Sequence, residues 1–256
     1  MGSEMCIRDS ARRMIKTIHG EFKPVDILAI GVHPDDIELS CAGTILNQID
    51  KGQSVGVADL TQGELGSRGS AATRLIESKQ SAEILGLDFR VNLQMRDGFF
   101  SIDERHIMRV VELIRRCKPT IILANAVDDR HPDHGRASEL VRQAFFYSGL
   151  RRIEIANTTA YRAKALYYYI QDKQLEPDFC VDVSPYVETK MKSIAAFSTQ
   201  FNVDQKEKIQ TPISSGKFTD FIKSKMQVFG RSIGVDYAEG FNTQRTLGVD
   251  DVMKLL

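Results

Sequence analysis

The sequence has no excess of charge of either sign, no long hydrophobic run and only four cysteines. Its 34 basic and 34 acidic residues give a formal net charge of zero, which argues against the broad basic surface that binds nucleic acid. No apolar stretch approaches the roughly 18 residues of a membrane-spanning helix. The cysteines form no C-x-x-C pair and lie in or beside apolar segments, as free thiols of a reducing compartment do. We therefore expect a cytoplasmic protein with no nucleic-acid or membrane partner.

The first 22 residues differ from the remainder of the chain. They contain basic residues such as Arg12 and Arg13 but no apolar segment, so they do not form a secretory signal. We interpret residues 1–22 as an extension and expect one domain over residues 23–256. The chain has 256 residues, of which 42% are hydrophobic, and this is enough to bury the core of an ordinary globular protein.

Short apolar runs alternate with amphipathic stretches over the first part of the chain. We expect strands at 25–32, 54–60, 89–93 and 120–127, with helices near 41–52, 72–85, 107–117 and 140–145. Such alternation favours a parallel sheet with helices on both faces, in which ligands bind beyond the carboxyl ends of the strands. The last hundred residues are less regular, with strands expected at KALYYYI and FCVDV and helices at 188–197 and 218–229. The sequence predicts an α/β, Rossmann-like, mostly parallel sheet with an elaborated C-terminal part.

Two similar tetrapeptides follow two of the expected strands. His33-Pro34-Asp35-Asp36 follows the first strand, and His131-Pro132-Asp133-His134 follows the fourth. Proline favours an extended residue before it and suits the first position of a helix, so each histidine should lie at a strand-to-helix turn. The residue three positions later falls in the first helical turn and can return to the same side. We expect both motifs at one cleft.

Two imidazoles and one carboxylate with an open position form a catalytic zinc arrangement. We predict His33, Asp36 and His134 as the metal ligands. Ferrous iron accepts the same ligand types, so Zn²⁺ is the expected metal and Fe²⁺ the alternative. One H-P-D motif alone could be a turn that caps a helix, but two copies at matching strand ends favour a metal site.

Three further residues of these motifs would stay unligated beside the ion. Asp35 could act as general base toward water. His131 could stabilise a developing oxyanion or protonate a leaving amine. Asp133 could hold the His131 imidazole in one tautomer and favour its charged form.

Two candidate substrate-binding residues follow the other strands. The planar guanidinium of Arg68, in the loop after the second strand, could hold an anionic or carbonyl group. Asp97, after the third strand, could accept hydrogen bonds from sugar hydroxyls. A solvated loop arginine and an ordinary turn aspartate are the alternatives.

At these positions the chain resembles the LmbE-like (PIG-L) zinc-dependent N-acetylglucosamine deacetylases. The resemblance runs from about residue 25 to the end and rests on AIGVHPDDIELSCAGT, DLTQGELGSRGS and DDRHPDHGRAS. Farther on, AFSTQF, TPISS and DYAEGF resemble C-terminal elements of the bacillithiol-biosynthesis branch, which acts on N-acetylglucosaminyl malate.

The resemblance implies a Rossmann-like fold, a small aminosugar substrate and assembly into homo-oligomers, commonly hexamers. It also implies a role for each motif residue: zinc on His33, Asp36 and His134, Asp35 as general base, His131 with Asp133 as polarising acid, and Arg68 as a substrate contact.

Other functions use similar residues. The enzyme could deacetylate another aminosugar, such as a chitooligosaccharide or a glycolipid headgroup. Two histidines and a carboxylate also form non-haem iron oxygenase sites. A non-enzymatic sugar- or nucleotide-binding α/β module is the remaining alternative.

Overall fold

The computed structural model describes residues 15–16, 22–201 and 211–255. Its centre is an eight-stranded sheet with the order β1-β4-β3-β2-β5-β6-β8-β7. The strands are β1 (Ile15–Lys16), β2 (Ile27–Gly31), β3 (Val55–Thr61), β4 (Phe89–Met95), β5 (Ile121–Ala124), β6 (Ala165–Tyr169), β7 (Phe179–Asp182) and β8 (Ala238–Thr243). Strands β1 to β6 run parallel, whereas β8 is antiparallel to both β6 and β7.

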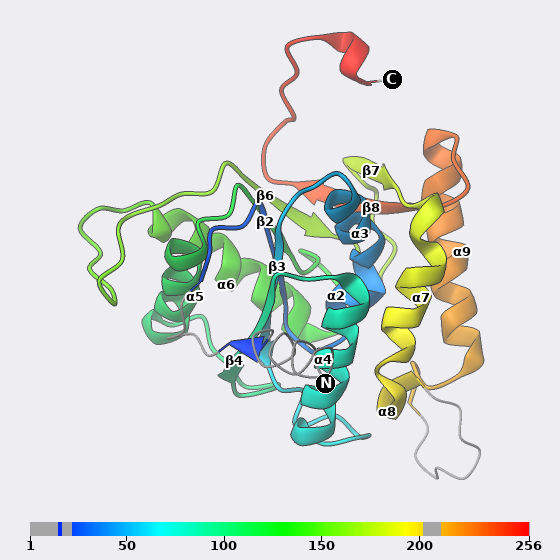
Figure 1. Cartoon of the computed structure of the whole chain (residues 1–256), viewed down its shortest axis with the longest axis horizontal. Coiled ribbons are helices and arrows are strands. Elements are labelled where there is room, and N and C mark those ends of the chain that lie inside the picture. The colour runs from blue at the N-terminus through cyan, green and yellow to red at the C-terminus, as the bar shows by residue number, and fades with distance from the viewer. Residues whose placement is uncertain (1–14, 17–21, 202–210, 256) are drawn as a thin grey trace, which may run out of the picture.

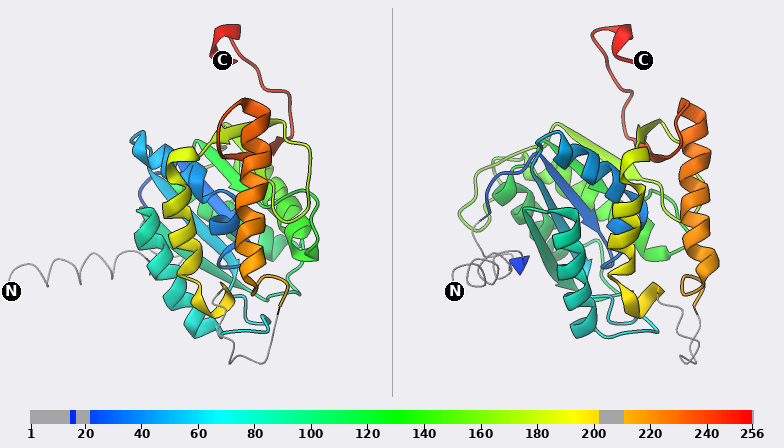
Figure 2. Two further views of the ribbon diagram at one scale, coloured as in Figure 1. Left: turned by 90° about the vertical axis from the view of Figure 1, so that its right-hand side faces the viewer. Right: turned by 45° about the vertical axis from the view of Figure 1, so that its right-hand side comes forward.

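Helices cover both faces of the sheet (Figures 1 and 2). One face carries α5 (Glu104–Cys117) and α6 (Pro132–Ser148), and the other carries α2 (Asp36–Ser40), α3 (Ala42–Asp50) and α4 (Ala71–Leu85). Helices α7 (Val187–Ala195) and α8 (Ser198–Phe201) pack outside this second layer, and α9 (Gly216–Ile233) packs against β7 and β8. Side chains of all three helices contribute to a smaller apolar cluster. Two 3₁₀ helices complete the description, η1 (Ser184–Tyr186) and η2 (Val252–Leu255).

The strand order brings the two motif-bearing strands together. The chain runs from β2 outward to β3 and β4, then returns to place β5 on the other side of β2, so that Ile27 pairs with both Val55 and Ile121. The order therefore reverses between β2 and β5. In open parallel sheets a ligand crevice opens at such a reversal, beyond the carboxyl ends of the strands.

Local sequence explains where these elements begin and end. All five residues of β2 are buried, as a strand covered on both faces requires. Helix α4 begins with a capping box between Ser70 and Thr73 and ends at Gly86, which has φ 71°. The Asp103 side chain accepts a hydrogen bond from the His106 N–H at the start of α5.

The predicted fold class is confirmed, including the C-terminal strands β6 and β7 and helices α7 and α9. Strand β8 was not predicted. Most of the expected extension lies outside the described residues, but Ile15–Lys16 pairs with β4 and the Phe22 ring lies 5.0 Å from that of Phe89. The proposed boundary at residue 22 stays a prediction.

Two further expectations concern thiols and membranes. Cys41 and Cys117 are buried free thiols, and Cys180 is half-buried and also free. Among the described residues, no helix has both the length and the apolar character that crossing a membrane requires.

Candidate active site

A cleft of about 400 Å³ opens at the carboxyl ends of β2 and β5. Both tetrapeptide motifs contribute to its floor, together with the loops after β3 and β4. Part of the wall comes from the C-terminal region, including Pro212, Ile213 and Phe218. The topological reversal thus produces the cleft that the alternation of strands and helices predicted.

Asp36 is the centre of the site. Its Oδ2 accepts hydrogen bonds from the backbone N–H groups of Val32 (2.9 Å) and His33 (3.0 Å) and from Nδ2 of Asn125 (2.9 Å). Its Oδ1 lies 3.2 Å from Nε2 of Gln171. These donors come from both sides of the β2–β5 pair and fix the orientation of the carboxylate.

Two imidazoles face the Asp36 carboxylate, and the other ring nitrogen of each imidazole contacts a further carboxylate. His33 Nδ1 lies 3.8 Å from Asp36 Oδ2, while its Nε2 lies 3.0 Å from Asp97 Oδ1. His134 Nε2 lies 3.2 Å from Asp36 Oδ1, while its Nδ1 lies 2.5 Å from Asp129 Oδ2. One ligand atom from each of His33, Asp36 and His134 falls within 4.8 Å of the others. A metal-binding histidine commonly has its second nitrogen fixed by a carboxylate in this way.

The electrostatics of the cluster favour positive charge. Burial alone would lower the pKa of the His33 imidazole, but Asp133, Asp36 and Asp97 raise it well above its usual value. Burial would likewise lower the pKa of His134, which Asp36 and Asp129 raise to about 9. Burial would raise the pKa of the Asp36 carboxyl, yet the two imidazoles hold it well below its usual value. This donor set fits a divalent cation, which would replace the protons on the two rings.

Asp35 adopts a strained backbone conformation at the edge of the cleft. Its φ of 129° is one that L-residues rarely adopt, and such conformations cluster at functional sites. Its Oδ2 lies 2.5 Å from Nη2 of Arg74. Burial raises the pKa of the Asp35 carboxyl to about 7 although Arg74 opposes the shift. The carboxyl therefore titrates near neutrality beside the predicted metal ligands.

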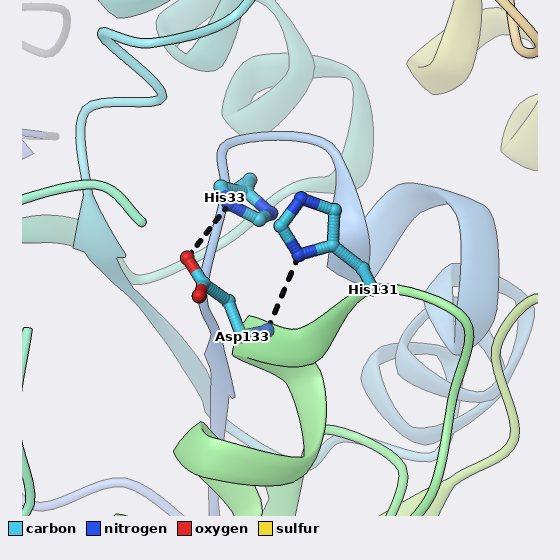
Figure 3. Close-up of side chains that lie close together, drawn as sticks. All are labelled: His33, His131 and Asp133. Atoms are coloured by element: carbon cyan, nitrogen blue, oxygen red, sulfur yellow. Dashed lines mark hydrogen bonds and ion pairs between the residues drawn. The ribbon is translucent and has the colours of Figure 1, made fainter. Parts of the chain in front are cut away.

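His131 and Asp133 are arranged differently from the expectation (Figure 3). The Asp133 backbone N–H donates to Nδ1 of His131 over 3.3 Å, so the helix start itself engages the ring. The Asp133 carboxylate turns away, accepts hydrogen bonds from the Gly98 N–H (2.9 Å) and Arg136 (2.7 Å), and faces Nε2 of His33 at 3.8 Å. The expected carboxylate–imidazole contact between Asp133 and His131 is absent from this geometry. The reason is that Asp133 lies in the first turn of α6, within reach of Arg136 three residues later.

A second combination of possible ligands, His33, His131 and Asp133, also falls within 4.8 Å. It shares His33 with the first group. In this second group Nδ1 of His131 already accepts the Asp133 N–H, whereas in the first group Asp36 faces two imidazoles whose other ring nitrogens each contact a further carboxylate. The first group is therefore the better metal site.

The two expected substrate contacts have other partners. Asp97 lines the cleft, but one carboxylate oxygen faces His33 and the other accepts from the Leu65 N–H at 3.0 Å. Arg68 is buried, and its Nη1 lies 3.5 Å from the carbonyl oxygen of Gln200. In this geometry Asp97 orients a predicted ligand, and the guanidinium of Arg68 contacts α8.

Four residues of the site were not predicted: Arg74, Asn125, Asp129 and Gln171. Asp129 precedes the second motif in the string DDRHPDH and could have been found as a nearby carboxylate. Asn125 follows directly on β5, where a polar residue at a strand end is a usable signal. Arg74 and Gln171 come from α4 and from the residues after β6, and no local pattern distinguishes them.

Comparison with known proteins finds similarity to deacetylases of aminosugars. Residues 28–145 match the family described as PIG-L, GlcNAc-PI de-N-acetylase. The chain is 28% identical over 228 residues to the diacetylchitobiose deacetylase of Thermococcus kodakarensis, a match that covers 84% of this chain and 81% of that protein.

Solved structures share the whole fold. The conserved protein TT1542 of Thermus thermophilus is similar with a TM-score of 0.80 and 33% identity, over 88% of this chain and 98% of that one. The N,N'-diacetylchitobiose deacetylase of Pyrococcus horikoshii has a TM-score of 0.74 and 24% identity, over 94% of this chain and 92% of its own, which supports the fold. The family match spans both tetrapeptide motifs and the strands that bring them together, so this chain is similar to the PIG-L de-N-acetylases over residues 28–145.

Proposed function

We propose that this protein is a metal-dependent hydrolase that removes the acetyl group from an N-acetylglucosaminyl conjugate. The observation that carries the proposal is the Asp36 carboxylate between two imidazoles, each fixed at its other nitrogen by a second carboxylate. The match of residues 28–145 to the GlcNAc-PI de-N-acetylases, and similarity to a diacetylchitobiose deacetylase, support the amide of an aminosugar as the target.

His33, Asp36 and His134 would hold the ion, with Zn²⁺ expected and Fe²⁺ as the alternative. A bound Zn²⁺ ion polarises a carbonyl and acidifies water to a pKa of roughly 7. Asp97 and Asp129 would keep the two rings in the orientation that the ion needs.

The unligated motif residues supply the proton transfers. Asp35 would take a proton from the attacking water, a role that suits a carboxyl with a pKa of about 7. His131 accepts the Asp133 N–H at Nδ1, so the proton of its neutral ring lies on Nε2 and can be donated to the carbonyl oxygen as negative charge develops there. As the C–N bond breaks, the proton that Asp35 took from water passes to the amine nitrogen, and acetate and the free amino sugar are the products.

N-acetylglucosaminyl malate, the bacillithiol precursor, is the substrate that we favour. The strings that resemble that branch contribute Gln200, Thr211 and Pro212 to the cleft wall. The cleft is also lined by cationic side chains, Arg130 and Lys225, which would complement a dicarboxylate. A chitooligosaccharide is the second candidate because the relative from Thermococcus kodakarensis acts on diacetylchitobiose. Arg68 would support the loop that contacts the sugar.

The test is a product assay on the purified protein. We expect acetate release from N-acetylglucosaminyl malate, abolished by a chelator and restored by Zn²⁺ or Fe²⁺. Diacetylchitobiose assayed in parallel distinguishes the two substrates. Turnover that requires oxygen would instead indicate an oxygenase, and sugar binding that is unaffected by the chelator, without turnover, would indicate a binding module.

Two properties implied by the family resemblance stay predictions. These are a cytoplasmic location and assembly into a homo-oligomer such as a hexamer. Sedimentation of the purified protein measures the second directly.

A further inference from the structure

We propose that Arg74 is the positioning residue for Asp35: its guanidinium fixes the backbone and the carboxylate of this residue so that one carboxylate oxygen faces the cleft. This inference rests on the proposed function, in which Asp35 accepts the proton of water. It adds a residue from α4 to a site whose predicted ligands and general base come from the two tetrapeptide motifs.

The contacts of Arg74 involve both the side chain and the backbone at Asp35. Nη2 lies 2.5 Å from Asp35 Oδ2 and donates to the carbonyl oxygen of Pro34 over 2.9 Å. A single nitrogen of Arg74 therefore binds both the Asp35 carboxylate and the carbonyl of the preceding peptide group. Because this contact uses Oδ2, Oδ1 is the oxygen left for a water molecule in the cleft.

The backbone of Asp35 needs such a restraint. A φ of 129° is one that L-residues rarely adopt, and it persists only where the surroundings enforce it. Asp35 is the residue before α2, and its side chain makes no capping hydrogen bond to that helix. The restraint comes from Arg74 in α4, the helix that follows the loop after β3, whose guanidinium contacts Asp35 and the peptide group before it.

Arg74 is itself held in one place. The capping box at Ser70 and Thr73 starts α4 so that Arg74 falls in its first turn, and its side chain is buried. Gly63 makes room for it, because a Cβ on that glycine would lie 2.0 Å from Nη1 of Arg74. The absence of a side chain at Gly63 therefore leaves room for the buried guanidinium.

The experiment compares Arg74→Ala with a matched control, Arg115→Ala. Arg115 is also buried, and within the described part of the chain it donates to the backbone carbonyls of Ser148, Leu150 and Ile153, at and after the end of α6. We expect Arg74→Ala to lower kcat by ~100-fold, the effect of a misplaced catalytic group, with KM and metal content nearly unchanged. Millimolar guanidinium should restore part of kcat in Arg74→Ala and have no effect on Arg115→Ala.

Two further measurements keep the test decisive. If Arg74→Ala does not fold, Arg74→Lys retains one cationic donor, and we expect an intermediate kcat. A crystal structure of the variant should show the Asp35 carboxylate turned from the cleft or its φ changed. Unaltered Asp35 geometry, or a kcat equal to that of wild type, would overturn the role of Arg74.

If the proposed deacetylase function is wrong, the wild-type protein itself will show it in the acetate assay. A wild-type protein that releases no acetate from any aminosugar would refute the deacetylase assignment. The position of Asp35 in the variant crystal would still decide whether Arg74 fixes it.

Discussion

The two H-P-D motifs have nearly the same sequence but start their helices in different ways. In the second motif Pro132 is the first residue of a 17-residue helix, and the His131 ring accepts a backbone N–H at its start. In the first motif the helix begins two residues after Pro34, is five residues long, and has no side-chain cap. A strained Asp35 occupies the junction instead.

This difference in helix starts determines which side-chain atoms of each motif are free to face the predicted metal position. In the second motif the histidine ring is engaged by its own helix, and only His134 faces the metal position. In the first motif neither His33 nor Asp36 caps a helix with its side chain, so both can face the predicted metal position, and Asp35 is held by another element. A stable helix start and the proposed general base thus place different demands on the same tetrapeptide.

The largest expected effect comes from Asp36, a residue of the first motif whose carboxylate contacts an imidazole of each motif. Replacing it with alanine removes the carboxylate between the two imidazoles and leaves Asn125 and Gln171 without their acceptor. We expect Asp36→Ala to bind no metal and to show no turnover, measured by elemental analysis and the acetate assay. Asp172→Ala, a cleft residue paired with Arg130, should keep its metal. Full metal content in Asp36→Ala would mean that the ion lies elsewhere.

Asp35 and Asp133 occupy the same position in the two motifs, so their variants test the comparison directly. Asp35→Ala should retain the metal but lose ~100- to 10,000-fold in turnover, because a general base is removed. Asp133→Ala should lose only ~10-fold, as expected for a group that contacts a ligand ring. Equal losses in the two variants would contradict the different roles that we assign.

A variant of Asp129 tests whether this carboxylate positions His134, the predicted ligand of the second motif. Asp129→Asn removes the charge behind His134 and should weaken metal binding by ~10- to 100-fold. The neighbouring Asp128 is exposed and pairs with Lys173, so Asp128→Asn is the matched control. Competition with a chromogenic chelator measures both affinities, and similar values for the two variants would refute this role.

The smallest effect is a pH dependence of stability in the metal-free protein. The folded pKa of His134 is about 9, above the usual 6.5, because Asp36 and Asp129 overcome the effect of burial. The protonated ring stabilises the fold fully below about pH 6.5, and this contribution is lost as the pH rises through about 9. We expect the unfolding temperature of the metal-free protein to fall over this range more than that of the loaded protein. Parallel curves would exclude the effect.

The sequence contained enough information for the sheet and for the convergence of His33, Asp36 and His134 at one cleft, whereas their role as metal ligands stays a prediction. Continuous apolar runs predict buried strands whatever their neighbours are, and paired motifs at strand ends converge when the sheet is parallel. Strand β8 was missed because Glu239, Gly240 and Asn242 break its apolar pattern. Glu239 is buried there because it binds the N–H groups at the start of α3 and the ammonium of Lys190.

The supporting residues could not be predicted in the same way. Arg74 reaches Asp35 from another helix, and Gln171 reaches Asp36 from beyond β6. Such contacts depend on tertiary packing rather than on spacing along the chain. The direction of the Asp133 side chain likewise depends on Gly98, a residue from the loop after β4.

The pairing of β2 with β5 has a consequence for how the protein matures. A nascent chain that ends before β5 contains only His33 and Asp36 of the three predicted ligands, too few to bind an ion tightly. Acquisition of the cofactor would therefore mark the moment at which the two halves of the central layer have joined.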